Sequence, residues 1–500
     1  MDVQSVATVN DLRQLTGSEG QTIILECYAQ PGDGGGGIFT YIHSHTAVDD
    51  GGTIFKFDVP SSPILEGAWY RMYAGPLNAL WFGLDSTGSS PNDSAHSNML
   101  ASAAAGKSPG FFYPSGTYLF EKTIGPWPLG ARILGSGISI LGNPHVNDQG
   151  GTVFHFSGSG VAVELGHDPD VNTRNGSVFE GIEVLGVNPN GAASYPNINE
   201  IGIEILNDGS VTVRNCRIGG FKFSISLDGA EVCAVEGCNF DGAPPAGKGY
   251  PVSDLSADLG ALSAFAIRLG TWKSQAGLAC NQIVISNCQF NNTYWGVLHN
   301  GGFNHHIVDC NFESNVAILT EANFATIYEN ITGEGAFNSN FLTTGTNYHL
   351  TLKNVVVTQS CPLLTLLGPQ YGLNLLGNYL QGSTCPFPVV GSRFIAGGSS
   401  LGNIGPVGAG EGTAGVIFDT DPLSIVELNY AYNKSNPALG INCTPLSPID
   451  INDNRLRIRD SHTPSSSADS SGNVGDICWD ANYIYVKTQA GWTRSPLTAW

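Results

Sequence analysis

Three carboxylates recur at one position of a repeating segment of the chain. Asp241, Glu313 and Glu334 each lie three residues after a position that is occupied by an apolar residue in every repeat. Two carboxyl groups, one donating a proton and the other acting as nucleophile or base, are the machinery of glycoside hydrolysis. The pattern therefore indicates a sugar-cleaving site, provided that the fold stacks these positions side by side.

A ladder of small apolar residues provides the repeat that would stack them. Cysteines stand 22 residues apart in two pairs, and Ile and Val take the same place after further steps of 21 and 24 residues. The ladder positions are Cys216, Cys238, Cys288, Cys310, Ile331 and Val355. A period in the low twenties with short β-rich runs predicts an all-β chain folded as a right-handed, single-stranded parallel β-helix. Because Ile and Val replace cysteine, we predict that the cysteines face inward as small apolar residues.

A second ladder directly precedes the first. The residue before each apolar position is a small turn-former that tolerates the left-handed conformation and hydrogen-bonds to nearby backbone. These residues are Asn215, Gly237, Asn287, Asp309, Asn330 and Asn354. They predict one turn that is repeated in every coil.

The stacking predicts distances between the carboxylates. Neighbouring coils lie ~4.8 Å apart, so Glu313 and Glu334 would be one coil spacing apart. Asn291 would separate Asp241 from Glu313, at about twice that spacing. The first separation suits a retaining pair at about 5–5.5 Å, and the second suits an inverting pair at about 6.5–9.5 Å. We take Glu313 and Glu334 as acid and nucleophile or base, in either order, with Asp241 as the alternative base.

Long insertions accompany this column. One begins directly after Asp241, and another lies at the same turn one coil earlier, at 186–200. Long loops on a solenoid usually map to one functional face. Amide and aromatic residues near the column are candidates for binding sugar. They are Asn291, Tyr294, Trp295 and Tyr250, and Trp272, which lies near a rival site on the opposite turn, is a further candidate.

A rival site is predicted on the opposite turn. Asp228, Asn300 and Glu321 lie ten residues before ladder positions, and Glu231 forms a local carboxylate pair with Asp228. His, Lys and Tyr residues nearby would suit a lyase, in which a base removes the proton next to a uronic-acid carboxylate.

Composition bounds the other possibilities. The 500 residues are 41% hydrophobic and 13% charged, and the 65 glycines disfavour long helices. A net charge of −21 argues against a nucleic-acid groove. We find no secretory signal and no apolar run of 18 residues, so no membrane insertion is expected. The eleven cysteines form no CxxC pair or zinc pattern, so neither a metal nor a cofactor is expected.

The entry to the repeat region resembles the pectate-lyase-like β-helix superfamily. The matching residues are Asn92-Asp93, the alanine-rich segment that follows, and the turn Pro114-Ser115-Gly116-Thr117-Tyr118. The resemblance implies a helix near 93–105 that plugs the open end of the solenoid.

Both ends of the chain resemble bacteriophage tail proteins. Residues 5–73 resemble the small N-terminal module of tailspikes, with Gly-rich 32–37 and Asp49-Asp50-Gly51-Gly52 as hallmarks, and 471–500 resemble a C-terminal segment of tail proteins. The expected organisation is a β module at 1–75, the β-helix at 76–455, and a Ser-rich linker with a small β module at 456–500.

The tailspike resemblance implies a function. It implies a homotrimer on the virion tail, attached to other tail proteins through the N-terminal module, that binds a bacterial capsular or O-antigen polysaccharide and hydrolyses it through paired carboxylates. Two alternatives stay open on the same scaffold. They are a polysaccharide lyase and a non-catalytic receptor-binding tail protein.

Overall fold

A computed structural model describes most of the chain. The described residues are 4–43, 46–57, 67–104, 110–138, 150–167, 176–186, 201–241, 265–270, 280–334, 339–343, 346–357, 364–366, 370–380, 389–391, 394–396, 398–401, 426–428, 463–472 and 474–498. The chain forms two compact units, Met1–Cys443 and Thr444–Trp500. The domain boundary expected at 455/456 lies outside the described residues.

A five-stranded sheet with one short helix forms the N-terminal module. Its elements are β1 (Gln4–Val6), α1 (Val9–Gln14), β2 (Thr22–Leu25), β3 (Gly37–His43), β4 (Ile54–Lys56) and β5 (Gly67–Arg71). The strand order is β1-β2-β3-β5-β4, and β1 is parallel to β2 while the other pairs are antiparallel. Leu12, Phe39, Tyr41 and Trp69 fill its core.

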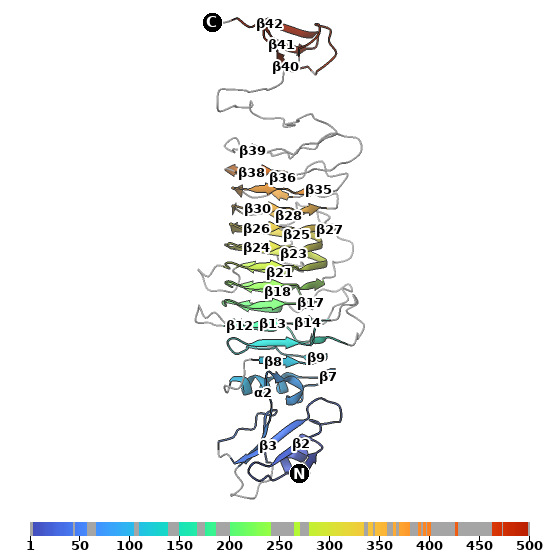
Figure 1. Cartoon of the computed structure of the whole chain (residues 1–500), viewed down its shortest axis with the longest axis vertical. Coiled ribbons are helices and arrows are strands. Elements are labelled where there is room, and N and C mark those ends of the chain that lie inside the picture. Colours follow the sequence, from blue (N-terminus) through green and yellow to red (C-terminus); the bar gives the residue numbers. More distant parts are fainter. Residues whose placement is uncertain are drawn as a thin grey trace. The chain divides into compact units, whose positions relative to one another are not determined.

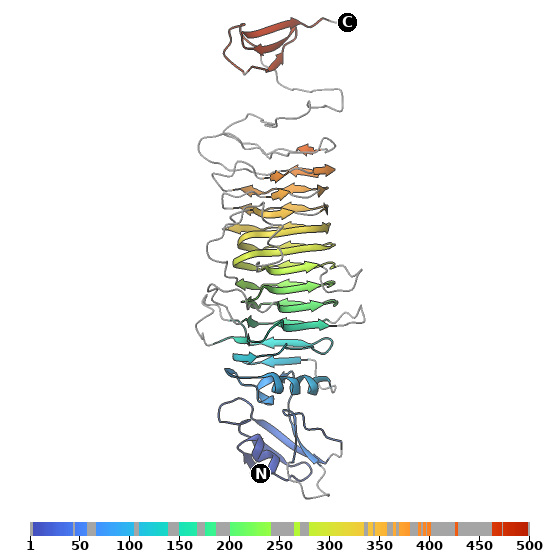
Figure 2. The same ribbon diagram turned by 180° about the vertical axis from the view of Figure 1, so that it is seen from behind.

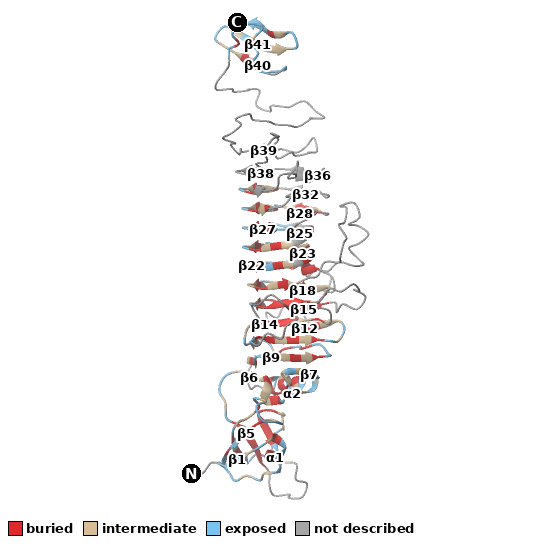
Figure 3. Ribbon diagram, turned by 90° about the vertical axis from the view of Figure 1, so that its right-hand side faces the viewer, coloured by how far each residue is buried: buried red, intermediate tan, exposed pale blue. Residues whose placement is uncertain are grey.

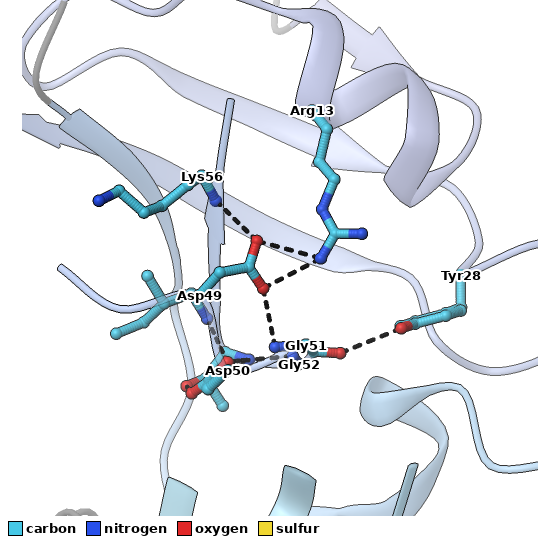
Figure 4. A network of polar contacts seen from close by, with 9 residues as sticks. Arg13, Tyr28, Asp49, Asp50, Gly51, Gly52 and Lys56 are labelled. Carbon is cyan, nitrogen blue, oxygen red and sulfur yellow. Dashed lines mark hydrogen bonds and ion pairs between the residues drawn. The ribbon is translucent and has the colours of Figure 1, made fainter. Parts of the chain in front are cut away.

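The Asp-Asp-Gly-Gly motif is a structural turn (Figure 4). Asp49 accepts two hydrogen bonds of 3.0 Å from one guanidinium nitrogen of Arg13 and others from the backbone N–H groups of Gly51 and Lys56. Asp50 accepts from backbone groups of the same turn and, at 2.9 Å, from the hydroxyl of Ser102 in α2. The motif thus links the module to the helix that follows.

Arg71 joins the two glycine-rich motifs. It is 6% exposed, and its guanidinium donates to the carbonyls of Gly52, Gly36 and Gly35 at 3.0, 2.7 and 2.8 Å. A Cβ on Gly36 would lie 2.4 Å from the carbonyl oxygen of Glu26, so only glycine fits there. The glycine-rich run therefore serves chain packing.

Helix α2 (Asp93–Ala104) closes the end of the repeat region, as the resemblance implies. It follows β6 (Leu77–Asn78), the 3-10 turn η1 (Ala79–Phe82) and β7 (Thr87–Pro91), and its buried Met99 and Ala103 belong to the core of the solenoid. Asn92 accepts the first helical hydrogen bond through its carbonyl, while its side chain binds the backbone of Asp85.

Burial of His96 in helix α2 makes the stability of the folded protein depend on pH. The side chain is 4% exposed against Phe120 and Trp127, and burial lowers its pKa to about 3. The unfolded chain takes up this proton near pH 6.5, so the stability that neutral His96 provides is complete above about pH 6.5 and is lost as pH falls toward 3. We expect His96→Phe to recover about 2 kcal/mol at pH 5. Thermal unfolding between pH 7 and 4 tests this, and parallel pH profiles for the two proteins would contradict it.

Thirteen parallel strands form one face of the solenoid (Figures 1 and 2). In spatial order they are β6, β8 (Gly110–Tyr113), β10 (Arg132–Gly135), β13 (Val178–Glu180), β16 (Thr212–Arg214), β19 (Ala234–Glu236), β22 (Val284–Ser286), β24 (His306–Val308), β26 (Ile327–Glu329), β30 (Thr351–Lys353), β34 (Asn374–Leu376), β38 (Gly398–Leu401) and β39 (Val426–Leu428).

The other strands wrap round the remaining sides, each pairing with its counterpart in the next coil. The second face holds β7, β9 (Gly116–Phe120), β11 (Thr152–Phe156), β14 (Ile182–Leu185), β17 (Arg217–Gly219), β20 (Asn239–Asp241), the starts of β23 (Gln289–Phe303) and β25 (Asn311–Phe324), β27 (Thr332–Glu334), β31 (Val356–Val357) and β35 (Tyr379–Leu380). The third face holds β12 (Val161–His167), β15 (Ile201–Leu206), β18 (Phe223–Asp228), β21 (Phe265–Gly270), the ends of β23 and β25, β28 (Ser339–Thr343), β32 (Leu364–Leu366) and β36 (Val389–Gly391). Three short strands continue it: β29 (Asn347–Tyr348), β33 (Gln370–Tyr371) and β37 (Phe394–Ala396).

The interior confirms the apolar ladder (Figure 3). Cys216, Cys238, Cys288 and Cys310 are at most 3% exposed, and Ile331 and Val355 continue the same buried column. All eight described cysteines are free thiols. Desolvation by burial raises the pKa of the Cys233 thiol to about 12, which disfavours thiolate chemistry.

The turn ladder is also confirmed. Every residue predicted to lie in this turn has a φ between 52° and 60°. Adjacent side chains are linked along the ladder, because Asn330 donates to Asp309 at 2.9 Å and Asn354 donates to Asn330 at 3.1 Å. Each coil thus turns at the same place, which keeps the strands in register.

The turn ladder predicts an order of stability for two variants. Asn330→Ala places a Cβ-bearing residue without a capping amide in the left-handed region, at a cost of ~1–2 kcal/mol. Asn330→Gly should cost less, because glycine already occupies this turn at Gly237 and Gly377. Thermal unfolding midpoints should rank wild type, then Asn330→Gly, then Asn330→Ala. An alanine variant as stable as wild type would show that the conformation carries no such cost.

The C-terminal unit is a small antiparallel sheet. It consists of β40 (Ile477–Trp479), β41 (Tyr483–Thr488) and β42 (Gly491–Pro496) around Cys478, Tyr485 and Trp492. The Ser-rich segment expected as a linker is instead folded in its described part, 463–472. Asp469 accepts hydrogen bonds from Ser465 and Ser471, and the indole of Trp492 donates to the carbonyl of Ser471.

Candidate functional site

The carboxylate column has the register that its spacing predicts. Asp241 pairs with Asn291, Asn291 with Glu313, and Glu313 with Glu334, on the successive strands β20, β23, β25 and β27. Glu313 and Glu334 are therefore one rung apart, at ~4.8 Å between backbones, and Asp241 is two rungs from Glu313. All of them point away from the core, since inward Phe240, Phe290, Phe312 and Gly333 alternate with them.

Glu313 and Glu334 lie next to each other on the outer surface of the solenoid. Glu313 is half-buried and Glu334 is exposed. Neither makes an ion pair or a side-chain hydrogen bond in the part of the chain that the structure describes. Two carboxylates held this close by a rigid backbone can act on one bond placed across them.

Asp241 has a different environment. Nε of Arg217 lies 2.5 Å from its Oδ2, and Arg217 is only 5% exposed. This carboxylate neutralises a buried guanidinium, and removing either partner would leave a charge uncompensated. This contact makes Asp241 a weaker candidate for a base than the sequence suggested.

Amides surround the carboxylates. Asn291 donates to Asn239 at 2.9 Å, which fixes its side chain beside the column. Asn311, two residues before Glu313 on the same side of β25, has a buried Oδ1 without a hydrogen-bond partner among the residues that the structure describes. Such an orphaned acceptor is uncommon in folded proteins and fits a hydroxyl-bearing ligand or water.

The rival site is not assembled as expected. Asp228 pairs with Gly270 and Gly270 with Asn300, but Asn300 then pairs with Ala322 and not with Glu321. A register shift between β23 and β25 makes Glu321 the extra residue of a bulge, and its side chain lies outside the described part. Asp228 is 0% exposed, so substrate does not reach it in this structure.

Glu231, the partner proposed for Asp228, lies in the turn before β19. It is half-buried and accepts a hydrogen bond of 3.4 Å from Asn281 in the next coil. This contact binds two coils together, which is a structural role.

One predicted aromatic platform is wrong. Trp295 is 4% exposed and stacks on Phe265, with ring centroids 5.4 Å apart. Its faces are covered by protein, so it presents none to a sugar ring. Tyr250 and Trp272 lie outside the described residues, as does the side chain of Tyr294.

A second outward column was missed by the sequence reasoning. Glu164, Glu204, Ser226 and Arg268 occupy successive rungs of β12, β15, β18 and β21. Nε of Arg268 donates to Ser226 at 2.7 Å, and Glu204 and Arg268 are 5% and 8% exposed. Charged groups this buried on an outward face form a second candidate site, the Glu204–Arg268 column.

Two members of the Glu204–Arg268 column could have been predicted from the sequence. Glu204 and Ser226 each lie twelve residues before a ladder cysteine, flanked by alternating apolar residues. The segment 271–279 separates Arg268 from Cys288 by twenty residues instead, which hides it from a search at fixed spacing.

Two negative findings apply to the described part of the chain. None of its helices has the length and hydropathy of a bilayer span. Its His, Cys, Asp and Glu side chains form no group of three or more that could hold a metal ion.

Comparison with known families identifies two segments. Residues 5–74 match the phage tail protein small four-stranded beta-sheet domain, and residues 136–332 match the right-handed beta helix region. None of the curated proteins matches the chain.

Solved structures share the fold at low identity. Full-length tailspike protein 2 of Escherichia coli O157:H7 bacteriophage CAB120 matches with a TM-score of 0.57 and 14% identity, over 88% of this chain and 57% of that one. The enzymatically active domain of bacteriophage CBA120 tailspike protein 2 matches at 0.53 and 15%, over 79% and 57%. The tailspike of Acinetobacter phage vB_ApiP_P1 matches at 0.57 and 14%, over 100% and 91%. The chain thus spans 57% of the length of the first two.

The chain joins a segment that matches a phage tail β-sheet domain to a right-handed parallel β-helix, and it shares its fold with solved bacteriophage tailspike proteins. The fold and the tailspike resemblance expected from the sequence are confirmed.

Proposed function

We propose that this protein is a phage tailspike that binds a bacterial surface polysaccharide, capsule or O-antigen, and hydrolyses its glycosidic bonds. The observation that carries the proposal is the in-register pair Glu313 and Glu334, which has no partner among the described residues. One carboxyl group protonates the leaving oxygen, and the other attacks the anomeric carbon or activates water. Fold alone does not grant this activity, so the site must carry the argument.

The separation of the pair favours a retaining mechanism. One rung of ~4.8 Å is near the roughly 5–5.5 Å between carboxyl groups in retaining enzymes. Asn291 and Asn311 would bind sugar hydroxyls beside the pair, since an amide both donates and accepts hydrogen bonds. Pairing of Glu313 with Asp241, two rungs away, is the inverting alternative.

A lyase is the second candidate on this scaffold, and the site favours it less. Lyase chemistry needs a base and a cation that neutralises a uronic-acid carboxylate. Among the described outward residues of the second face from β14 to β27, the one cationic side chain is Arg217, which already pairs with Asp241.

The assembly belongs to the same proposal. We infer that the protein works as a homotrimer on the virion tail and that the N-terminal module attaches it to other tail proteins. The match of residues 5–74 to a phage tail domain supports the attachment. Tailspikes with the same fold, one of them solved as an enzymatically active domain, support the activity.

Product analysis tests the proposed reaction. Purified protein is incubated with capsular and O-antigen polysaccharides from candidate hosts, and the fragments are sized by mass spectrometry. Hydrolysis predicts whole repeat units plus one water. Fragments lacking that water and absorbing in the ultraviolet would establish a lyase, and binding without shortening of any polymer would leave the non-catalytic receptor-binding role.

A further inference from the structure

Exposed apolar side chains gather at one corner of the solenoid. In the described part of the β-helix from β13 onward, the exposed large hydrophobic residues are between 37% and 44% accessible. They are Val232, Val284, Phe303, Phe324 and Ile327. Phe303 and Phe324 end β23 and β25, Val232 lies just before β19, and Val284 and Ile327 begin β22 and β26.

Phe303 and Phe324 continue with Tyr348 as one column along the coil axis, and Val232, Val284 and Ile327 lie beside it in the same corner of the coils. Phe303 pairs in register with Phe324, and Phe324 with Tyr348, on successive coils. Their rings stack with centroids 4.9 and 4.5 Å apart and interplanar angles of 24° and 4°. We name Val232, Val284, Phe303, Phe324, Ile327 and Tyr348 the aromatic stripe.

The geometry of the rings makes the stripe a poor sugar platform. A pyranose packs on the face of an aromatic ring, whereas here the faces of Phe303, Phe324 and Tyr348 are turned toward one another. What remains for solvent is mainly a row of ring edges, which pack well against other apolar and aromatic side chains. The stripe therefore suits a protein surface.

The repeat and the charge of the chain point to another copy of itself. The stripe advances by one coil spacing, ~4.8 Å, and a straight apolar run of the same spacing is offered by a second solenoid lying alongside. Each copy carries a net charge of −21, so copies repel unless their contact is free of like charges. None of the six stripe residues is ionised at neutral pH.

We propose that the aromatic stripe lies along the threefold axis of a parallel homotrimer, where each stripe residue meets its own counterparts at the same height. The proposal rests on the trimer of the proposed function and assigns the surface that forms it. Apolar and aromatic residues at the centre with polar residues at the rim are the usual anatomy of such an interface. His306 stands between Val284 and Ile327 on the ladder and lies 3.4 Å from Glu329, so one polar side chain interrupts the stripe.

Sedimentation velocity on the full chain tests the proposal. Wild type should sediment at three times 52.6 kDa. Phe303→Glu with Phe324→Glu should shift the mass to that of one chain, because six carboxylates would meet on the axis. Leu129→Glu is the matched control, since Leu129 is 65% exposed and lies outside the stripe. A trimer that survives both stripe substitutions would overturn the proposal.

A crosslink tests the same contact without disrupting it. Phe324→Cys should form a disulfide between chains under mild oxidant, while wild type with its buried described cysteines should not. Absence of that crosslink in a trimeric variant would also overturn the proposal. A monomeric wild type that still shortens polysaccharide would refute the interface proposal but not the proposed reaction. A crosslinked trimer that does not shorten any polysaccharide would support the interface and refute the reaction.

Discussion

Replacing Glu313 and Glu334 together by glutamine is expected to lower the rate of polysaccharide cleavage by about 10²–10⁴-fold. Glutamine keeps the size of each side chain but neither gives up a proton nor attacks a sugar. Because the residues act as a unit, each single variant should lose nearly as much as the double one. Reducing-end release under saturating polymer measures the effect.

The controls separate catalysis from charge. Glu236→Gln makes the same change on an outward position of the thirteen-stranded face, where Glu236 pairs in register with Arg214 and Ser286, and it should leave the rate unchanged. Glu204→Gln makes it in the Glu204–Arg268 column. Full activity in Glu313→Gln and Glu334→Gln, together with loss in Glu204→Gln, would move the reaction to that second column.

Phe290→Ala is expected to lower the free energy of unfolding by about 3–5 kcal/mol. Phe290 is fully buried between Phe240 and Phe312, with ring centroids 4.9 and 4.1 Å away. Removing the Phe290 ring leaves a cavity and eliminates both of its stacking contacts, with Phe240 and with Phe312. The coils on either side carry Asp241 and Glu313, so the loss should also disturb the spacing of the site.

Chemical denaturation and activity report on the two effects separately. Phe290→Leu fills most of the space and should cost much less than the alanine variant. Wild-type stability of Phe290→Ala would mean that the stack does not hold the coils together. A destabilised variant with an unchanged rate at low temperature would mean that the column tolerates movement of its backbone.

The repeat could be predicted because it depends on local rules. A buried apolar residue and a left-handed turn recur in every coil, so the spacing alone predicts where Cys216 and Asn215 lie. The same periodicity places Glu313 beside Glu334. Register in a parallel solenoid is a property of spacing, which sequence contains.

Site residues were predicted wrongly or missed where the repeat spacing changes, or where their role depends on how exposed they are. A bulge of one residue moved Glu321 out of line, and the segment 271–279 hid Arg268 from the alignment. Trp295 was taken for a surface ring because its type suits sugar binding, but its covered faces depend on Phe265 in another coil. The ion pair of Asp241 was missed for a similar reason. Its partner Arg217 lies in the neighbouring coil, two residues before Gly219, which occupies the column position there.

The central claim is that the scissile bond lies across Glu313 and Glu334. A crystal structure of the Glu313→Gln, Glu334→Gln variant with an oligosaccharide of at least two repeat units tests it most directly. We predict a glycosidic oxygen within hydrogen-bonding distance of one substituted side chain, and the anomeric carbon facing the other. An oligosaccharide bound along Glu204 and Arg268, with residues 313 and 334 open to solvent, would contradict the claim.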